Sequence, residues 1–247
     1  MPISWLPRDQ TETYLMNDLL FSPPACAVLP VQGEARGYPV RNVYGVTRNY
    51  DPGGVIRAQG ERPLPAIFTK SALWVVTSGA ALPYPPASQR LEPEIEMILA
   101  IGTAVRDIDP RDAGAAIFGY AVGLDMTRRD LQHEARAKRD PLDIAKWFEG
   151  ATPVSALARA ADIGHPASGA ITLDVNGTRV QAGDLGDMIW RPAEIVAMLS
   201  HFVPLYPGDI IFTGTPPGEI ALRPGDRLAG AIAGVGSLDL TIAPAQG

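Results

Sequence analysis

The sequence predicts an α+β protein that is rich in β-strands and has only short helices. Of its 247 residues, 25 are glycine and 24 are proline, and this composition favours many turns and short strands over long helices. Hydrophobic residues make up 46% of the chain and charged residues 19%, as is typical of a globular protein. Strand-like and helix-like segments do not alternate regularly, so an array of β-α-β units is not expected.

The N-terminal part of the chain contains no long periodic segment and is rich in turns. Pro23-Pro24 and Leu29-Pro30 indicate extended chain. We interpret residues 1–40 as an extension or small subdomain, and residues 41–247 as the main domain. A chain of this length suffices for one large domain with such an appendage.

The main domain is expected to begin with two short strands. Val43–Val46 is apolar, and Ile67–Lys70 resumes a strand pattern after an interruption. Between them, Asp51-Pro52-Gly53-Gly54 has the composition of a turn. The polar segment 55–62 is expected to be a mobile loop.

The next strand carries two acidic residues at its start. Successive side chains of a strand point to opposite faces, so Glu94 and Glu96 share one face. The opposite face is expected to belong to the core, with Ile95, Met97, Leu99 and Ile101. A second apolar run, 119–124, ends at Asp125. Neighbouring carboxylates repel each other, and a hard divalent cation would relieve the conflict, although an edge strand with two solvated glutamates has the same spacing.

Two helices are expected around the second run. Asp109-Pro110 has the composition of a helix start, and this helix would end before Gly119. Thr127 with Asp130 resembles a capping pattern and predicts a helix that continues to about Lys138. On that helix Arg129 and Gln132 are three residues apart, so they share one face.

The C-terminal part is expected to contain a hairpin, a helix and several strands. Asn176-Gly177 between two alternating segments, 171–175 and 178–180, predicts a hairpin with a two-residue turn. Pro192–Phe202 has the apolar periodicity of an amphipathic helix, with Ile195, Met198, Leu199 and Phe202 on its apolar stripe. Further strands are expected at Ile210–Phe212 and around Leu228 and Leu238.

Composition excludes several kinds of partner. A formal net charge of −6 argues against nucleic acid, but a metal ion and a few basic side chains can still attract a small anionic substrate. The one cysteine cannot form an internal disulfide. With no signal peptide and no run of eighteen apolar residues, we expect a cytoplasmic protein that does not contact a membrane.

Several motifs, in this order and spacing, resemble the fumarylacetoacetate hydrolase family, and most closely its short members that act on acylpyruvates, such as fumarylpyruvate hydrolases. The resemblance runs from about Val43 to Ile242. It implies a mixed β-sandwich roll with flanking short helices, a homodimer and a role in aromatic catabolism. The motifs are Thr47-Arg48-Asn49-Tyr50, Glu94-Ile95-Glu96, residues 119–132, Ala145-Lys146, Gly183-Asp184, residues 188–190 and residues 208–216.

The resemblance also implies a set of site residues. Glu94, Glu96 and Asp125 would bind Mg²⁺ or Mn²⁺. Lys146 and Thr215 would be catalytic, with Lys146 placing positive charge beside a developing oxyanion. Substrate contacts would come from Arg129, Gln132, Arg48, Tyr50 and Gly214. The residues alone leave plainer interpretations open: a surface lysine, a solvated helix face and an ordinary turn.

The implied reaction is hydrolysis of a C–C bond in a 2,4-dioxo acid such as fumarylpyruvate, through a metal-stabilised enolate. Hydrolytic relatives carry a His–Glu pair on a lid as the base that activates water, whereas Gly53 and Ile56 occupy those positions here. Asp51, Glu61 and His133 are the candidate substitutes. Decarboxylation or tautomerisation of an oxaloacetate-type β-keto acid is therefore the alternative, because neither needs activated water. A non-enzymatic binding role is the third candidate function.

Overall fold

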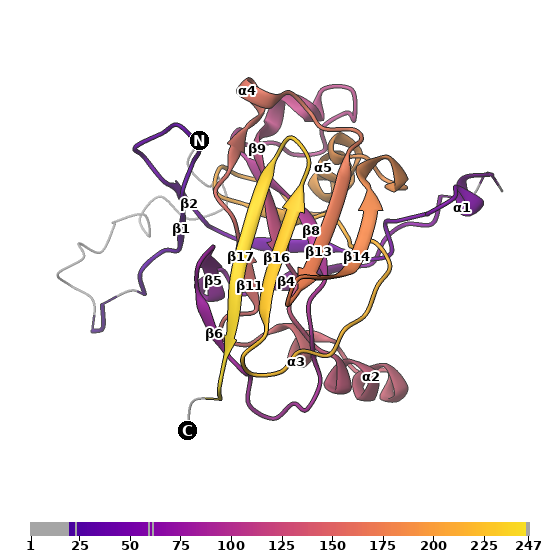
Figure 1. The fold of residues 1–247 in the computed structure, drawn as a ribbon. Helices are drawn as coiled ribbons and strands as arrows, with labels where there is room; N and C mark the ends of the chain where they lie inside the picture. Colours follow the sequence, from indigo (N-terminus) through magenta and orange to yellow (C-terminus); the bar gives the residue numbers. More distant parts are fainter. Residues whose placement is uncertain (1–19, 23, 59, 61, 246–247) are drawn as a thin grey trace.

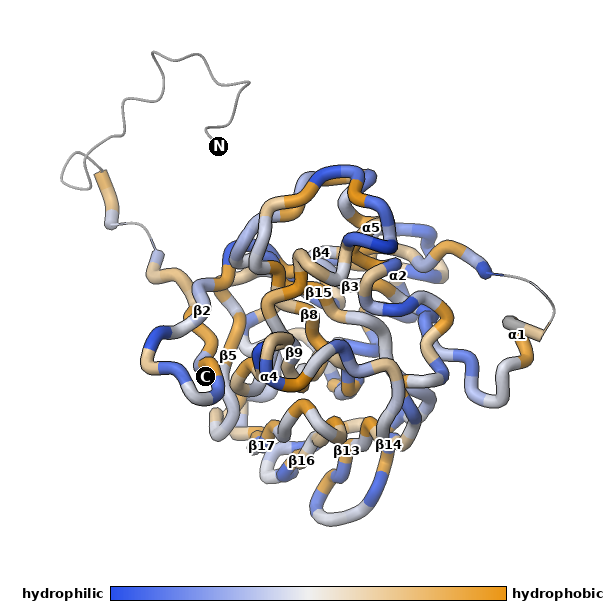
Figure 2. Tube along the Cα trace, turned by 90° about the horizontal axis from the view of Figure 1, so that it is seen from above, coloured by the Kyte–Doolittle hydropathy of each residue, from blue (hydrophilic) through white to orange (hydrophobic). Residues whose placement is uncertain are grey.

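The computed structural model describes residues 20–22, 24–58, 60 and 62–245, and in it two β-sheets lie face to face (Figures 1 and 2). The larger sheet has eight strands, and its centre is formed by β15, β8 and β9. Its strands, in spatial order, are β4 (Ile67–Lys70), β3 (Val43–Val46), β15 (Ile210–Phe212), β8 (Ile95–Ile101), β9 (Ile117–Leu124), β11 (Thr152–Val154) and β5 (Val75–Thr77), with β12 (Ala158–Arg159) also paired to β9.

The smaller sheet contains the predicted hairpin. Asn176 and Gly177 have φ angles of 53° and 80°, the left-handed values that a tight two-residue turn requires. The expected strands at Val43, Ile67, Ile210, Leu228 and Leu238 are confirmed. The five strands, in spatial order, are β14 (Thr178–Asp184), β13 (Ala170–Val175), β16 (Arg227–Ile232), β17 (Gly236–Ala243) and β6 (Ala81–Pro83).

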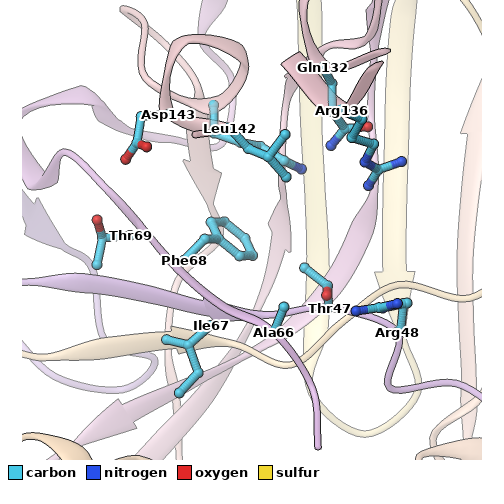
Figure 3. A pocket seen from close by; sticks show the side chains of 11 residues that line it. Thr47, Arg48, Ala66, Ile67, Phe68, Thr69, Gln132, Arg136, Leu142 and Asp143 are labelled. Carbon is cyan, nitrogen blue, oxygen red and sulfur yellow. The ribbon is translucent and has the colours of Figure 1, made fainter. Parts of the chain in front are cut away.

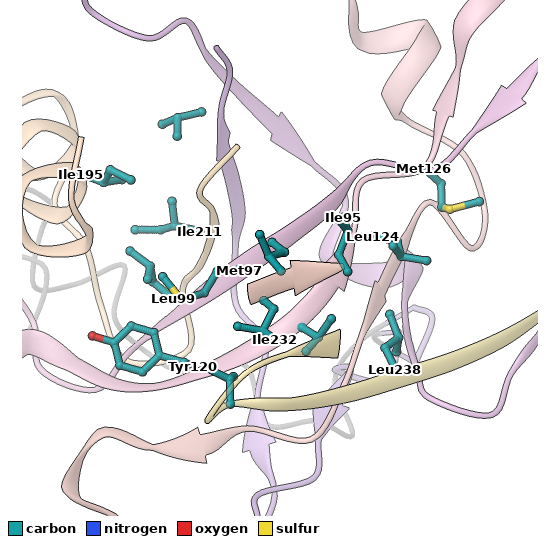
Figure 4. Packing of buried hydrophobic residues seen from close by; sticks show 14 of the residues in the cluster. Ile95, Met97, Leu99, Tyr120, Leu124, Met126, Ile195, Ile211, Ile232 and Leu238 are labelled. Atoms are coloured by element: carbon teal, nitrogen blue, oxygen red, sulfur yellow. The ribbon is translucent and has the colours of Figure 1, made fainter. Parts of the chain in front are cut away.

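The main core fills the space between the two sheets. Figure 4 shows Ile95, Met97 and Leu99 of β8 directed toward side chains of the smaller sheet such as Ile232 and Leu238. These β8 side chains are fully buried, so the expected core face of this strand is confirmed. The alternation of side chains along β8 therefore determines which face carries its acidic residues.

The N-terminal segment covers the outer face of the larger sheet. Leu29 in β1 (Val28–Leu29) and Tyr38 in β2 (Tyr38–Pro39) belong to a second apolar cluster that includes Phe212. The Tyr38 hydroxyl donates to the Ile101 carbonyl at 2.8 Å. This cover explains why β8 is buried on both faces. The domain boundary at residue 40 stays a prediction, and residues 1–19 lie outside the described residues.

The helices are short and lie around the sheets, as Figure 1 shows. Helix α2 ends at the predicted Lys138, and α5 has the predicted bounds, although Phe202 of its expected apolar stripe is exposed. The α-helices are α1 (Val55–Ala58), α2 (Arg129–Lys138), α3 (Asp143–Lys146), α4 (Ala160–Ile163) and α5 (Pro192–Phe202); short 3₁₀ helices are η3 (Ala72–Trp74), η4 (Ala113–Ala116) and η5 (Leu185–Asp187).

Two local expectations were wrong. Asp109 does not begin an α-helix: the chain makes a turn and then the short η4, because Gly114 and the small residues around it supply no apolar stripe. Thr127 is not a helix cap, since it lies in β10 (Thr127–Arg128), which pairs with β7 (Leu91–Glu92). Its hydroxyl instead accepts a hydrogen bond from Lys146.

A protruding segment that includes residues 52–58 and 60, which we call the lid, is joined at both ends to the same part of the molecule. Before it, Tyr50 pairs with Met188 and the Asp51 N–H donates to the Asp187 carbonyl. After it, the Arg62 guanidinium lies 4.3 Å from the centre of the Trp190 ring and pairs with Glu194 at 2.8 Å. The expected loop contains one short helix, α1. Among the described residues, no helix is both long and apolar enough to span a bilayer.

Candidate active site

All ten residues that the sequence placed in the site line one cavity of about 370 Å³. They come from six elements of the chain: the loop after β3, the start of β8, the end of β9, helix α2, helix α3 and the turn after β15. The residues are Arg48, Tyr50, Glu94, Glu96, Asp125, Arg129, Gln132, Lys146, Gly214 and Thr215.

Three carboxylates converge at the inner end of this cavity. Ile95 of β8 pairs with Leu124 of β9, and this register places Asp125 beside Glu94, whose carbonyl accepts the Asp125 N–H at 2.8 Å. One carboxylate oxygen from each of Glu94, Glu96 and Asp125 lies within 4.8 Å of the other two. Hard oxygen ligands at this separation suit a divalent cation such as Mg²⁺ or Mn²⁺.

The environment of Glu96 supports the same conclusion. Its side chain is buried, and burial followed by the neighbouring Asp125 and Glu94 charges raises the pKa of its carboxyl well above the ordinary value. The backbone N–H of Gly214 donates to one Glu96 oxygen at 2.6 Å, which opposes that shift only in part. A bound cation would hold this carboxylate in its charged form.

Lys146, on α3, is buried among the carboxylates. Its ammonium donates to Glu94 at 2.7 Å, to Thr127 at 2.6 Å and also to Asp125. Burial lowers the pKa of this ammonium, but the Asp125 and Glu94 carboxylates outweigh burial and hold the pKa above its ordinary value. Lys146 is therefore a fixed cation at the inner end of the cavity and not a surface lysine.

A second buried lysine was missed in the sequence. Lys70, the last residue of β4, has its ammonium 2.5 Å from the other Asp125 oxygen. Burial lowers the pKa of Lys70, although Asp125 acts in the opposite direction. A lysine at the inward end of an otherwise apolar strand was the available signal, but its partner is 55 residues away in sequence.

Arg129 supports the carboxylates from α2. Its guanidinium donates to Glu92 at 2.6 Å, to Glu94 at 2.8 Å and to the Gln132 side-chain oxygen at 2.6 Å. Arg129 and Gln132 therefore share one helix face, as predicted, and both are buried. The interpretation as a solvated helix face is wrong for this pair.

The other polar groups of the cavity differ in whether they have a hydrogen-bond partner. The Tyr50 hydroxyl is buried and has no hydrogen-bond partner among the described residues, and burial raises its pKa. The Thr215 hydroxyl accepts a hydrogen bond from Gln181 at 3.0 Å. Tyr50 is thus the group whose hydrogen-bonding capacity remains for a ligand in the cavity.

Of the candidate substitute bases, Asp51 and His133 do not line the cavity. Asp51 is buried, and its carboxylate accepts the Ile56 N–H at 3.1 Å inside the lid. His133 is exposed on α2, and Glu61 lies outside the described residues. On the lid, Gly53 has a φ of 81° and Ile56 is apolar. Neither Gly53 nor Ile56 is among the residues that line the cavity.

A second cavity of about 770 Å³ adjoins the first and is shown in Figure 3. Its additional lining is largely apolar: Ala66, Ile67, Phe68 and Leu142, with Thr69 and Asp143. The residues common to both cavities are Thr47, Arg48, Gln132, Arg136 and Lys146. The site therefore has an acidic inner lobe and a larger, more apolar outer lobe, joined through these residues.

Comparison with known proteins gives a consistent result. The family model for the fumarylacetoacetate (FAA) hydrolase C-terminal domain matches residues 41–243. A fumarylpyruvate hydrolase from a Ralstonia species is 41% identical over 179 residues, which cover 72% of this chain and 93% of that protein. An oxaloacetate tautomerase from Escherichia coli is 34% identical, with coverage of 80% and 90%. The crystal structure of fumarylpyruvate hydrolase from Pseudomonas aeruginosa in complex with Mn²⁺ and pyruvate is 42% identical, with a TM-score of 0.85 and coverage of 92% and 99%.

Proposed function

Because the chain belongs to the fumarylacetoacetate hydrolase family, we propose that it hydrolyses a C–C bond of an acylpyruvate, with fumarylpyruvate as the reference substrate. The observation that carries the proposal is the convergence of Glu94, Glu96 and Asp125, with their oxygens within 4.8 Å, beside the buried Lys146. A divalent cation held by these three carboxylates, Mg²⁺ or Mn²⁺, would supply a Lewis acid for the 2-oxo acid.

The side chains around this centre have distinct roles in the proposed reaction. Water adds to the C4 carbonyl, the C3–C4 bond breaks, and its electron pair stays on the pyruvyl fragment, which then takes up a proton. Lys146 places positive charge beside the oxygen on which charge develops. Arg129 holds Glu94 in position, and Tyr50 offers its unpaired hydroxyl to a substrate oxygen. Thr215 and the Gly214 turn close the inner end of the cavity.

A second candidate function is favoured by the lid. Gly53 and Ile56 occupy the positions of the proton-accepting pair that the family resemblance led us to expect, and neither can accept a proton. Tautomerisation of oxaloacetate moves a proton between C3 and the C2 oxygen. Decarboxylation breaks the C3–C4 bond and releases C4 as CO₂, and the pyruvyl fragment keeps the electron pair and then takes up a proton. Neither step needs an activated water, and the relative from Escherichia coli that is 34% identical is an oxaloacetate tautomerase.

Further proposals concern the setting of the enzyme. We propose a homodimer, supported by the family resemblance and by an apolar patch on α3 and η3. In this patch Leu73, Ile144 and Trp147 are each more than half exposed, and the rings of Trp74 and Trp147 are 5.1 Å apart. We also propose a cytoplasmic location, which agrees with the single cysteine of the chain. The family resemblance supports a small anionic keto acid of aromatic catabolism as the substrate.

One assay separates the candidates and tests the cation site. The protein is incubated with Mn²⁺ or Mg²⁺ and either an acylpyruvate or oxaloacetate, and NMR follows pyruvate, CO₂ and exchange of the C3 protons. We expect turnover that is lost in Glu96→Ala but kept in Glu134→Ala, a change of an exposed carboxylate on α2. The midpoint temperature of thermal unfolding should rise with Mn²⁺ in wild type but not in Glu96→Ala, because a ligand that binds the native state stabilises that state. An equal Mn²⁺ response in both proteins would contradict the site.

A further inference from the structure

A buried glutamine of the smaller sheet contacts the site without lining its cavities. Gln181 lies in β14, and 1% of its surface is exposed. It is not among the residues that line the inner or the outer lobe. Both ends of its side-chain amide nevertheless form hydrogen bonds with segments of the chain that build the inner lobe. A buried amide is costly unless such bonds are made, so its position here is specific.

A β-bulge turns this glutamine toward the larger sheet. In the ladder between β13 and β14, Leu173 pairs with Gln181. The next residue of β13, Asp174, pairs with Arg179, so Val180 is an extra residue that faces no residue of β13. Paired residues lie on the same face of a sheet, and Leu173 is fully buried in the main core. The bulge therefore brings Gln181 to the inner face, where regular pairing would place Val180.

The hydrogen bonds fix the direction in which the Gln181 amide points. Its oxygen accepts the backbone N–H of Ile95 at 3.0 Å, and a backbone N–H can only donate. The nitrogen therefore faces the turn after β15, where it donates to the Thr215 hydroxyl at 3.0 Å and to the Pro216 carbonyl at 2.9 Å. Gln181 thus connects the start of β8, which carries two of the converging carboxylates, with the turn that closes the inner lobe.

The nitrogen of Gln181 determines which hydrogen bond the Thr215 hydroxyl can still form. A hydroxyl donates one hydrogen and accepts through its oxygen, and Gln181 already donates to that oxygen. Among the described residues, the hydrogen has one acceptor, the Pro216 carbonyl at 3.4 Å, which is long for a bond between two oxygens. That carbonyl also accepts from Gln181. The Thr215 hydrogen therefore remains for an acceptor in the inner lobe, whereas Tyr50 keeps both functions of its hydroxyl.

The backbone of this turn is held in place by other contacts. A Cβ at Gly218 would overlap the Val180 carbonyl, and a Cβ at Gly183 would overlap the Pro216 ring, so the turn lies directly against β14. The Gly214 N–H, in the same turn, donates to one of the three carboxylates at 2.6 Å. The Thr215 hydroxyl can still rotate about its own bond, and this rotation is what Gln181 restricts.

We infer that Gln181 is a positioning residue, which holds the Thr215 hydroxyl as a hydrogen-bond donor toward an acceptor oxygen of the ligand in the inner lobe. Without Gln181, the Pro216 carbonyl loses its donor and competes with the ligand for the Thr215 hydrogen. The inference rests on the proposed function, because that function places a 2-oxo acid in this lobe. It adds that the smaller sheet takes part in ligand binding through one side chain.

A double-mutant cycle on ligand binding tests this role. The probe is pyruvate, the fragment that the proposed hydrolysis releases, titrated calorimetrically into the Mn²⁺-loaded protein. Gln181→Met and Thr215→Val should each weaken pyruvate binding by about fivefold, the effect of one hydrogen bond. Adding Gln181→Met to Thr215→Val should weaken binding by less than about twofold more, because the hydroxyl that Gln181 orients is already absent.

Gln181→Met also leaves the Ile95 N–H without its acceptor, so thermal unfolding is used to check that this variant folds. Should it not fold, Gln181→Glu takes its place in the cycle. Glutamate keeps one oxygen for the Ile95 N–H and presents a second oxygen to Thr215, so the hydroxyl donates to that oxygen instead of to the ligand. The same loss of binding, and the same dependence on Thr215, is expected.

Gln32→Met is the matched control, because the Gln32 amide also donates to a backbone carbonyl, that of Val235 at 3.0 Å, and lines neither cavity. It should leave pyruvate binding unchanged. Losses that multiply in the double variant, or an unchanged affinity in either single variant, would overturn the inference and leave the proposed function standing. Failure of pyruvate to bind the Mn²⁺-loaded wild type would overturn the proposed function and the inference together.

Discussion

The two oxygens of Asp125 are each paired with a different lysine, and the two lysines differ in environment. Lys146 also contacts Glu94, whereas Lys70 has Asp125 as its one carboxylate partner among the described residues. Both ammonium groups are buried. Lys70 lies behind the carboxylate, away from the cavity lining, and therefore holds Asp125 in position instead of contacting substrate.

Replacing Lys70 by methionine should destabilise the metal-free protein. Removing one partner of a buried ion pair costs about 3 kcal/mol, because the remaining charge stays buried. Urea denaturation should show this loss, and added Mn²⁺ should recover part of it by pairing with Asp125. Lys138→Met, which breaks an exposed pair with Glu134, is the control and should leave the midpoint unchanged. A midpoint in Lys70→Met equal to that of the control would refute the pairing.

Glu94 should make stability depend on acidity in the metal-free protein. Burial raises the pKa of Glu94, but Lys146 and Arg129 outweigh burial and lower the pKa from 4.5 to about 2. The folded state thus binds this proton less strongly than the unfolded state, so the stabilisation is present above the ordinary pKa and is lost as the pH falls toward about 2.

Urea midpoints of wild type and Glu94→Gln, measured in chelator from about pH 5 to about pH 3, isolate this contribution. Wild type should lose more stability over this range, by up to about 2 kcal/mol, since one unit of pKa corresponds to about 1.4 kcal/mol. The raised pKa of Glu96 acts in the opposite direction, and because the Glu94 charge contributes to it, this opposing effect is larger in wild type and keeps the difference below that upper value. Parallel curves would show that Glu94 is not stabilised by its cationic neighbours.

At the scale of elements, we predict that the lid affects which reaction the site supports. Gly53→His with Ile56→Glu should raise the ratio of acylpyruvate hydrolysis to oxaloacetate tautomerisation by at least about tenfold, because a general base contributes about 10²–10⁴. The φ of 81° at Gly53 adds a cost of about 1–2 kcal/mol for any side chain. Gly53→Ala with Ile56→Gln has the same backbone cost without a base, so an equal ratio in the two double variants would contradict the prediction.

Local patterns predicted some parts of the site and not others. The period of two at β8 predicted that Glu94 and Glu96 share a face, and the spacing of three on α2 predicted the same for Arg129 and Gln132, but the family resemblance was needed to assign these residues to a site. Lys70 and the role of Thr127 depend on contacts between strands that are distant in sequence, and no local period encodes those. Asp109 has the composition of a helix start, but the small residues after it provide no apolar face to stabilise an α-helix.

At the scale of the whole molecule, the apolar patch on α3 and η3 predicts self-association. Light scattering at micromolar concentration should give the mass of a dimer. Leu73→Asp with Ile144→Asp should give a monomer, since large exposed apolar residues that gather on one surface are typical of interfaces. Lys138→Asp with Arg139→Asp, two changes at exposed positions outside the patch, should remain dimeric. A wild-type monomer would contradict the proposed assembly.

The attachment of both lid ends to the same region has a consequence for how this protein can change. Asp51 is held by Asp187, and Arg62 is held by Trp190 and Glu194. These contacts lie outside the lid, so the positions of its two ends do not depend on the lid sequence. The cost of closing such a loop depends only weakly on its length. We therefore expect the lid to tolerate substitutions, insertions and deletions. It can gain or lose a proton acceptor while the two sheets and the carboxylates stay in place.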